Sequence, residues 1–316
     1  MKKTLTVLGV IVLVIILVVG IGQWMNRSDG NGPAPTTGAG PMPPSGDQPE
    51  HCPAYEVIAA PGTWESNADD NPVHPTANPN SLLLNVTGPL QEAYGGDATA
   101  DGADGGVKVW TLPYAAQFRN INALGEMSYD DSRNQGYDRV SAEMASTYAE
   151  CPGTRFLLVG FSQGAVLTGD LVTEIGNGNG PVPAANVAGV SLIADGRRED
   201  GRGILVGSPD VRGIGAEIAL SSVNLLVQPI VPGASMRGPR PQDFGALGDR
   251  VNQFCDPADL VCSAPRDIGN AVQRANDLIA ANGIHAQYST NGNVVSGETV
   301  PQWIVNWARG IIDAGK

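Results

Sequence analysis

The stretch RFLLVGFSQGAVLTGDLV, residues 155–172, decides the fold. Residues 155–160 are an apolar run typical of a buried strand, and apolar residues at helical spacing resume at Ala165. Between them GFSQG, residues 160–164, matches the pattern G-x-S-x-G. Between a strand and a helix this pattern is typical of a nucleophile elbow, a tight turn that presents a serine hydroxyl at the carboxyl end of a sheet. The alternative is an ordinary glycine-serine turn, because a chain with 41 glycines contains short glycine patterns by chance.

Other short apolar runs extend this interpretation from one turn to a whole fold. Strands are predicted at residues 55–60, 107–112, 155–160, 187–194 and, more weakly, 250–254. Helical patterns separate them, with one helix face around 137–148 and further helices at 165–175, 268–281 and 300–312. Strands that alternate with helices indicate a three-layer α/β fold, with a central parallel five-stranded sheet covered on both faces. Chemistry is then expected at the carboxyl ends of the strands.

A serine nucleophile at Ser162 needs a base, which is most often histidine. The chain offers three histidines. His51 and His74 lie in polar, proline-rich surroundings, whereas His285 follows the LIAANG segment that ends a predicted helix. His285 also fits the chain order of serine, acid and histidine that α/β hydrolases use. The sequence therefore favours His285 as the base, the alternative being a surface-loop histidine.

The orienting acid is expected between Ser162 and His285, where several carboxylates lie. The stretch CDPADLVC, residues 255–262, contains two of them between two cysteines. Asp256 precedes a proline and is typical of a turn or cap. Asp259 is favoured as the acid, but spacing alone leaves both aspartates possible.

The four cysteines, Cys52, Cys151, Cys255 and Cys262, are an even number and indicate two disulfides in an exported chain. Four cysteines allow three pairings, and the simplest joins the near neighbours Cys255 and Cys262 and leaves Cys52 with Cys151. We expect no metal site, because no CxxC pair is present and the histidines are scattered.

The beginning of the chain differs from the rest. Lys2 and Lys3 precede an uncharged apolar run over residues 4–22, about the length needed to cross a bilayer. We predict an uncleaved transmembrane anchor at residues 1–26, the alternative being a signal peptide. Residues 27–50 are rich in proline and glycine and are predicted to be a tether. Residues 51–316 form the predicted folded domain, exported and on the outer side of the cell membrane.

Composition limits the partners. The chain has 316 residues and a net charge of -13, which suits one large domain with appendages. The excess of acidic residues argues against a nucleic-acid partner. We expect a membrane attachment through the first helix, a monomeric catalytic domain and, as the family resemblance described next implies, a lipid or acyl-ester substrate.

Three stretches together resemble the cutinase family. CPGTRFLLVGFSQGA is similar to the cutinase nucleophile segment, CDPADLVC to its acid loop, and CPAYEVIAAPGTWES to its first strand and the loop that follows. The likeness runs from Cys52 to the C-terminus. With the anchor and tether, the chain most resembles the membrane-anchored cutinase-like esterases of mycolic-acid-containing actinobacteria.

The resemblance implies a cutinase-type α/β hydrolase with Ser162 as nucleophile, His285 as base and Asp259 as acid. It also implies an oxyanion hole formed by the amides of Thr63 and Gln163, the disulfide pairing given above, and no cofactor. The anchored relatives act on lipids as phospholipases and thioesterases. An acyltransferase with the same triad and a non-catalytic envelope-binding protein are the alternatives.

The chain departs from the family pattern in three places. Pro61 stands where cutinases usually have arginine, residues 67–106 are longer than in small cutinases, and ADGRRED, residues 194–200, replaces the usual Gly-Asp-Pro. These departures make plant polyester an unsafe inference as the substrate. Residues 201–248, rich in glycine and proline, are interpreted as a lid, an acyl-binding wall or a surface excursion.

Overall fold

The computed structural model describes residues 48–95, 106–120, 122–207, 210–228, 231–266 and 283–315. The predicted anchor, most of the tether and the helix predicted at 268–281 therefore lie outside the described residues. Within the described ranges, no helix has the length and apolar character needed to cross a membrane.

The centre of the domain is a parallel six-stranded sheet with the order β2-β1-β3-β4-β6-β5. The strands are β1 (Tyr55–Ala60), β2 (Val107–Thr111), β3 (Arg155–Phe161), β4 (Val187–Ile193), β5 (Ile204–Leu205) and β6 (Val251–Phe254). The five predicted strands are present, but the prediction of a five-stranded sheet was wrong by one. The missed strand, β5, has only two residues, and both side chains are exposed. A strand of two exposed residues has no apolar run in the sequence from which it could be predicted.

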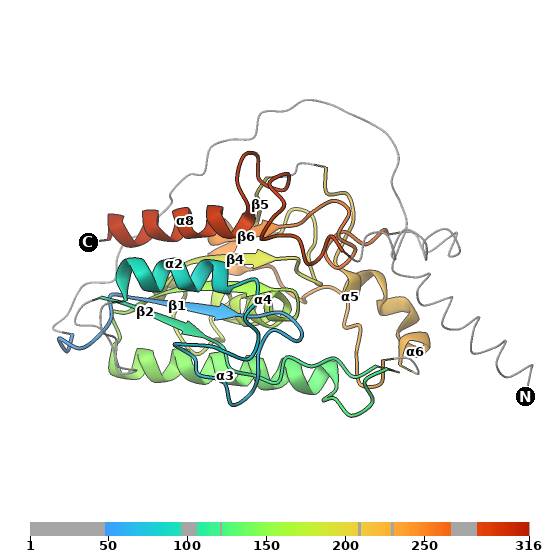
Figure 1. Cartoon of the computed structure of the whole chain (residues 1–316), viewed down its shortest axis with the longest axis horizontal. Coiled ribbons are helices and arrows are strands. Elements are labelled where there is room, and N and C mark those ends of the chain that lie inside the picture. Colours follow the sequence, from blue (N-terminus) through green and yellow to red (C-terminus); the bar gives the residue numbers. More distant parts are fainter. Residues whose placement is uncertain are drawn as a thin grey trace, which may run out of the picture.

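Helices cover both faces of this sheet and make the three layers (Figure 1). The main helices are α2 (Leu84–Tyr94), α3 (Tyr129–Glu150), α4 (Gln163–Gly176) and α8 (Val300–Ala314). Short elements complete the set: α5 (Ala216–Ala219), α6 (Asn224–Val227), η1 (Ala184–Asn186), η2 (Ser221–Val223) and η3 (Gly245–Arg250). Helix α2 was not predicted, because Gly88 and Pro89 interrupt its apolar pattern.

The sheet separates two apolar cores. Helices α2 and α8 pack on one face, and α3 and α4 pack on the other. In β1, Val57 and Ala59 point to the first core while Ile58 and Ala60 point to the second, as the two-residue period of a strand requires. The side of each helix follows from right-handed crossovers. The chain moves outward from β1 to β2 and then reverses to reach β3, so α2 and α3 lie on opposite faces.

The reversal also locates a site. Strands β1 and β3 are neighbours, although the chain leaves β1 toward the opposite edge. Open parallel sheets bind ligands outside the carboxyl ends of the strands at such a switch point. Thr63 follows β1 and Ser162 follows β3, so both predicted site residues lie at this edge.

Candidate active site

Ser162 occupies the tight turn between β3 and α4. Its backbone has φ 53° and ψ −117°, a conformation that L-residues rarely adopt. The Ser162 N–H donates to the carbonyl of Ile193 on β4 at 2.9 Å, which fixes the turn to the neighbouring strand. A Cβ at Gly164 would lie 1.9 Å from the carbonyl oxygen of Ala60, so a glycine is required for α4 to start this close to β1.

Backbone strain gathers at this edge of the sheet. Among the described residues, the non-glycine residues with positive φ are Trp64, Ala116, Ser162 and Ala194. They lie in the segments that follow β1, β2, β3 and β4 respectively. The Trp64 N–H donates to the Ala116 carbonyl at 2.6 Å and so links two of these strained loops. Strain of this kind persists only where surrounding contacts hold it, and it is common at functional sites.

The structure brings His285 to the serine and to the acid loop. His285 Nε2 lies 2.9 Å from Ser162 Oγ, and Nδ1 lies 2.8 Å from Asp259 Oδ2. The Phe161 ring stacks on the imidazole with ring centroids 5.0 Å apart. The three groups therefore form one continuous hydrogen-bonded chain, and the Phe161 ring packs against one face of the imidazole.

The acid loop distinguishes the two aspartates that the sequence left open. Asp259 is 1% exposed, and its Oδ2 also accepts the Tyr288 hydroxyl at 2.7 Å. Its Oδ1 accepts the Val261 N–H at 3.0 Å, so both oxygens are fixed. Asp256 instead accepts the Ala258 N–H at 2.8 Å, a local turn contact, and the Asn291 side-chain amide at 2.7 Å. The carboxylate that faces His285 is that of Asp259.

Two opposing effects act on the His285 side chain. Burial alone would lower the pKa of His285, but the Asp259 charge and hydrogen bond, together with the Glu65 charge, raise this pKa above its usual 6.5. A histidine with neighbouring carboxylates binds a proton more readily. The site therefore favours an imidazolium, the form that appears when a histidine removes a proton from serine.

The predicted oxyanion donors belong to the segments that follow β1 and β3. Gln163 is the first residue of α4, where backbone N–H groups have no partner within the helix. Its buried side chain accepts from Ser132 Oγ at 2.9 Å and donates to the Gln117 carbonyl at 3.2 Å. Thr63 lies in the turn that the Glu65 N–H closes onto the Gly62 carbonyl at 3.1 Å.

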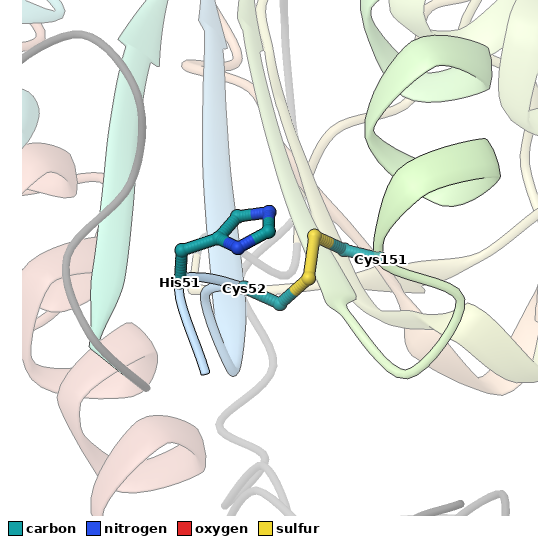
Figure 2. Close-up of side chains that lie close together, drawn as sticks. All are labelled: His51, Cys52 and Cys151. Carbon is teal, nitrogen blue, oxygen red and sulfur yellow. A yellow bond between two sulfur atoms is a disulfide. The ribbon is translucent and has the colours of Figure 1, made fainter. Parts of the chain in front are cut away.

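Both predicted disulfides are present, Cys52–Cys151 and Cys255–Cys262. Figure 2 shows His51 beside the first of them, the three side chains being close enough to suggest a metal cluster. The two sulfurs are bonded to each other, however, and a disulfide sulfur is not a thiolate ligand. On the surface, His51 Nε2 instead lies 2.9 Å from Glu150 Oε1.

Comparison with known proteins shows the family of this chain. Residues 91–294 match the family model described as Cutinase. A protein of Corynebacterium glutamicum described as a carboxylesterase Culp6 homolog is 53% identical over 320 residues, covering 100% of both chains. The chain belongs to the cutinase family. A cutinase of Kineococcus radiotolerans is 27% identical over 170 residues, or 52% of this chain and 42% of the relative.

Solved structures with a similar chain path include the catalytic core of Trichoderma reesei acetyl xylan esterase. It has a TM-score of 0.47 and 19% identity, and the match covers 84% of this chain and 100% of that one. A cutinase-like protein from Cryptococcus sp. has a TM-score of 0.43 and 17% identity, with 84% and 98% covered. As a member of the cutinase family with a close carboxylesterase relative, this protein is a serine carboxylic ester hydrolase.

The stretch where this cutinase-family member departs from the usual Gly-Asp-Pro has a structural role that the sequence did not reveal. Arg198 is almost fully buried, and its Nε donates to the Cys262 carbonyl at 2.9 Å, which holds the acid loop from behind. Its neighbour Arg197 donates to Asp170 on α4 at 2.8 Å. The only signal was a pair of adjacent arginines in the charged stretch ADGRRED, and a surface turn explains that signal equally well.

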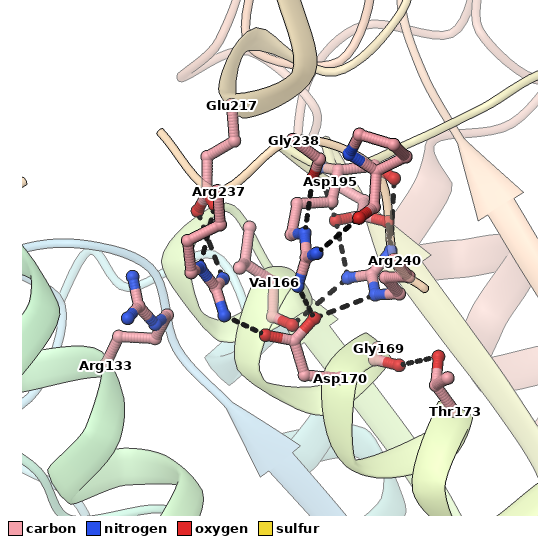
Figure 3. Close-up of polar contacts among 12 residues, drawn as sticks. Arg133, Val166, Gly169, Asp170, Thr173, Asp195, Glu217, Arg237, Gly238 and Arg240 are labelled. Carbon is pink, nitrogen blue, oxygen red and sulfur yellow. Dashed lines mark hydrogen bonds and ion pairs between the residues drawn. The ribbon is translucent and has the colours of Figure 1, made fainter. Parts of the chain in front are cut away.

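Asp170 is the centre of a buried ion network (Figure 3). Its oxygens accept from Arg197 and Arg240 at 2.8 Å each and from Arg237 at 2.6 Å. Arg240 also pairs with buried Asp195 at 2.7 Å, and Arg237 pairs with Glu217 on α5 at 3.0 Å. Three arginines and three carboxylates thus balance their charges, as buried ions must.

This ion network holds part of residues 201–248, the segment for which the sequence left a lid, an acyl-binding wall or a surface loop possible. Glu217, Arg237 and Arg240 all belong to residues 201–248, whereas Asp170 belongs to α4, the helix that starts at the serine. Movement of this part as a flap would separate several buried ion pairs. The contacts therefore favour a fixed position beside the cutinase-family site.

Proposed function

We propose that this protein is an envelope-anchored esterase that hydrolyses acyl esters or thioesters of lipids. Ser162 is the nucleophile, His285 the general base and Asp259 the acid that orients the base. The observation that carries the proposal is the hydrogen-bonded chain from Ser162 Oγ through His285 to Asp259, at 2.9 Å and 2.8 Å. Such a chain is the arrangement that activates a serine for acyl transfer.

The reaction follows from these positions. His285 Nε2 takes the proton from Ser162 Oγ as this oxygen bonds to the carbonyl carbon of the substrate. The resulting oxyanion is stabilised by the amides of Thr63 and Gln163 and by the positive end of α4. His285 then gives its proton to the leaving oxygen or sulfur, and the acyl group stays on Ser162. Water, deprotonated by His285, attacks the acyl-enzyme and releases the acid and the serine.

Exposed apolar side chains support a lipid substrate. Trp64, in the oxyanion turn, is 57% exposed, and Leu124 and Leu225 are 66% and 86% exposed. The Trp64 indole donates to Glu126 at 3.0 Å, which ties it to the loop that carries Leu124. Helix α6, with Leu225, lies beyond the carboxyl ends of the strands (Figure 1). Exposed apolar groups near a site are typical of surfaces that meet lipid or protein.

The predicted anchor and tether support a membrane location. The predicted tether, residues 27–50, has 24 residues, and a linker of that length has an end-to-end distance of about 25–30 Å if it behaves as a random coil. That reach lets one monomeric domain on the outer side of the membrane contact lipids of the same bilayer. Acyl lipids are therefore the proposed substrate class, in place of plant polyester.

The proposal is tested with the full chain in vesicles that contain candidate phospholipids and acyl thioesters. We expect the wild type to release free acid and to be labelled at Ser162 by a fluorophosphonate, and Ser162→Ala to lose both. The matched control Ser296→Ala changes an exposed serine and should keep both activities. Labelling at another serine would overturn the mechanism. Transfer of the labelled acyl group to added trehalose, without release of acid, would replace hydrolysis by acyl transfer.

A further inference from the structure

The turn that carries Thr63 lies directly against the nucleophile. A Cβ at Gly62 would be 2.7 Å from the Phe161 ring and 3.3 Å from the Ser162 Cβ, so the turn packs against both residues without room for a side chain at Gly62. A small displacement of this turn therefore moves the Thr63 amide relative to the serine. Oxyanion donors lose most of their effect when they are displaced from the developing charge.

The Glu65 carboxylate joins this turn to the start of α2. Glu65 Oε2 accepts the Gly62 N–H at 3.1 Å and the Ser81 hydroxyl at 3.3 Å. Glu65 Oε1 accepts the Leu82 N–H at 3.0 Å, two residues before α2 begins. Both oxygens are thus used to join the oxyanion turn to the start of a helix that packs in the core. A side chain with only one acceptor oxygen cannot make both backbone contacts.

The same carboxylate acts on His285 through its charge. The groups that face the imidazole are Ser162, the Phe161 ring, Asp259 and Tyr288, and Glu65 is the second carboxylate that interacts with it. Tyr288 is neutral here, because burial raises its pKa well above 10. Burial also raises the pKa of Glu65, against the effect of its backbone hydrogen bonds and of His285.

We infer that Glu65 is a positioning residue that holds the oxyanion turn and supplies His285 with a second negative charge. This inference rests on the proposed roles of Ser162, His285 and Thr63. The two effects can be tested separately. Holding the turn requires two acceptor oxygens on a side chain of the right length, whereas the effect on His285 requires only a negative charge.

Glu65→Gln removes the charge and one acceptor but keeps the size of the side chain. Without this charge the imidazolium is less favourable, so the acid limb of the kcat/KM profile should move to lower pH. We expect kcat to fall about 10- to 100-fold, with KM nearly unchanged, because the affected contact acts on the transition state. A merely structural residue would not move the acid limb.

Glu65→Asp makes the opposite change, since it keeps the charge and shortens the reach. It should lower kcat while leaving the acid limb near its wild-type position. Glu56→Gln is the matched control, a buried glutamate on β1 whose partners are Lys108 and Glu143. It should leave the acid limb of kcat/KM unchanged.

The experiment separates failure of this inference from failure of the proposed function. Fluorophosphonate labelling of the wild type at Ser162 tests the proposed function before any Glu65 variant is made. An acid limb in Glu65→Gln that coincides with that of the wild type would overturn the charge effect. An unchanged kcat in both Glu65 variants, folded by circular dichroism, would overturn the role in holding the turn.

Discussion

At the scale of single residues, two aspartates in one short loop have different surroundings. Asp259 is buried against His285 and Tyr288, whereas Asp256 closes a local turn. The two side chains have the same chemistry, so the difference lies in what each carboxylate contacts. Their variants should therefore fail in different ways.

Asp259→Asn should be folded but nearly inactive, because an amide does not stabilise the imidazolium or fix its tautomer. A loss of kcat of up to about 10⁴-fold is expected, the size found for this change in a serine protease. Asp256→Asn should keep its kcat and lose about 1 kcal/mol of stability, the cost of a weakened cap. Steady-state kinetics and denaturant unfolding of both variants measure this, and an inactive Asp256→Asn would remove Asp259 from the proposed mechanism.

The residues that the sequence did not reveal have one feature in common. Ser162, His285 and the acid loop could be predicted because the elbow, the chain order and the cysteine pair are local patterns. Glu65 and Tyr288 act through partners that are distant in sequence, such as Leu82 and Asp259. No spacing rule marks such contacts, since they depend on how the loops after different strands meet.

At the scale of elements, a short loop and a long segment are held by different means. The Cys255–Cys262 disulfide closes a loop with a separation of 7 residues, so it removes less chain entropy from the unfolded state than a disulfide that closes a long loop. The segment around Arg237 and Arg240 is held by ion pairs to α4. The first device controls the direction of a carboxylate, and the second controls stability. The fold itself was largely predictable because its strands are continuous apolar runs, apart from the two exposed residues of β5.

Replacement of both Cys255 and Cys262 by alanine should therefore lower activity more than stability. We expect kcat to fall about 10-fold or more, because a misdirected acid leaves the base poorly oriented. The midpoint of thermal unfolding should shift by only a few degrees. Kinetics and circular dichroism on the same samples test this, and loss of structure in step with loss of activity would show that the bridge serves the fold.

Asp170→Asn should have the reverse pattern. Burial would raise the pKa of Asp170, but Arg240, Arg237 and Arg197 together lower it, so the carboxylate is ionised in the folded protein. The variant leaves three arginines short of one charge, and removal of one partner from a buried pair costs about 3–5 kcal/mol. Denaturant unfolding near neutral pH measures this loss. Because the folded pKa is below the usual 3.8, the difference from wild type should disappear as the pH falls through that folded value.

At the scale of the whole molecule, three exposed apolar side chains, those of Trp64, Leu124 and Leu225, belong to segments that follow β1, β2 and β5 at the active end of the sheet. Strand direction sets this arrangement, since every strand is parallel and all carboxyl ends face the same way. The Cys52–Cys151 disulfide lies at the opposite end, just before β1 begins and where α3 ends. The proposed catalytic residues and this disulfide therefore lie at opposite ends of the sheet.

The apolar edge predicts a difference between soluble and aggregated substrates. Leu124→Ser and Leu225→Ser, combined in one variant, should lower the rate on phospholipid vesicles several-fold, because less apolar surface enters the lipid interface. Hydrolysis of a short soluble p-nitrophenyl ester should be unchanged, since neither side chain belongs to the proposed catalytic groups. An equal loss on both substrates would contradict an interfacial role.

A buried glutamate predicts how stability depends on pH. Burial raises the pKa of Glu56 to about 8 against the lowering effect of Lys108, whose Nζ lies 3.1 Å from it. The folded state then binds a proton that the unfolded state, with a pKa of 4.5, has released. The stability from this group should be present below about pH 4.5 and decline as the pH rises to about 8, by at most about 1.4 kcal/mol per unit. Glu56→Gln should remove this slope in denaturant unfolding across that range, and an unchanged slope would contradict the assignment.

The disulfide at the entrance of the domain has a mechanical consequence. Cys52 lies three residues before β1, a central strand that is hydrogen-bonded on both sides, and its partner lies 99 residues later at the end of α3. A pull on the chain before Cys52 would otherwise load β1 and peel it from the sheet. The covalent bond passes that load to the α3–β3 junction, so tension from the N-terminal side leaves the strand that leads into the oxyanion turn unloaded.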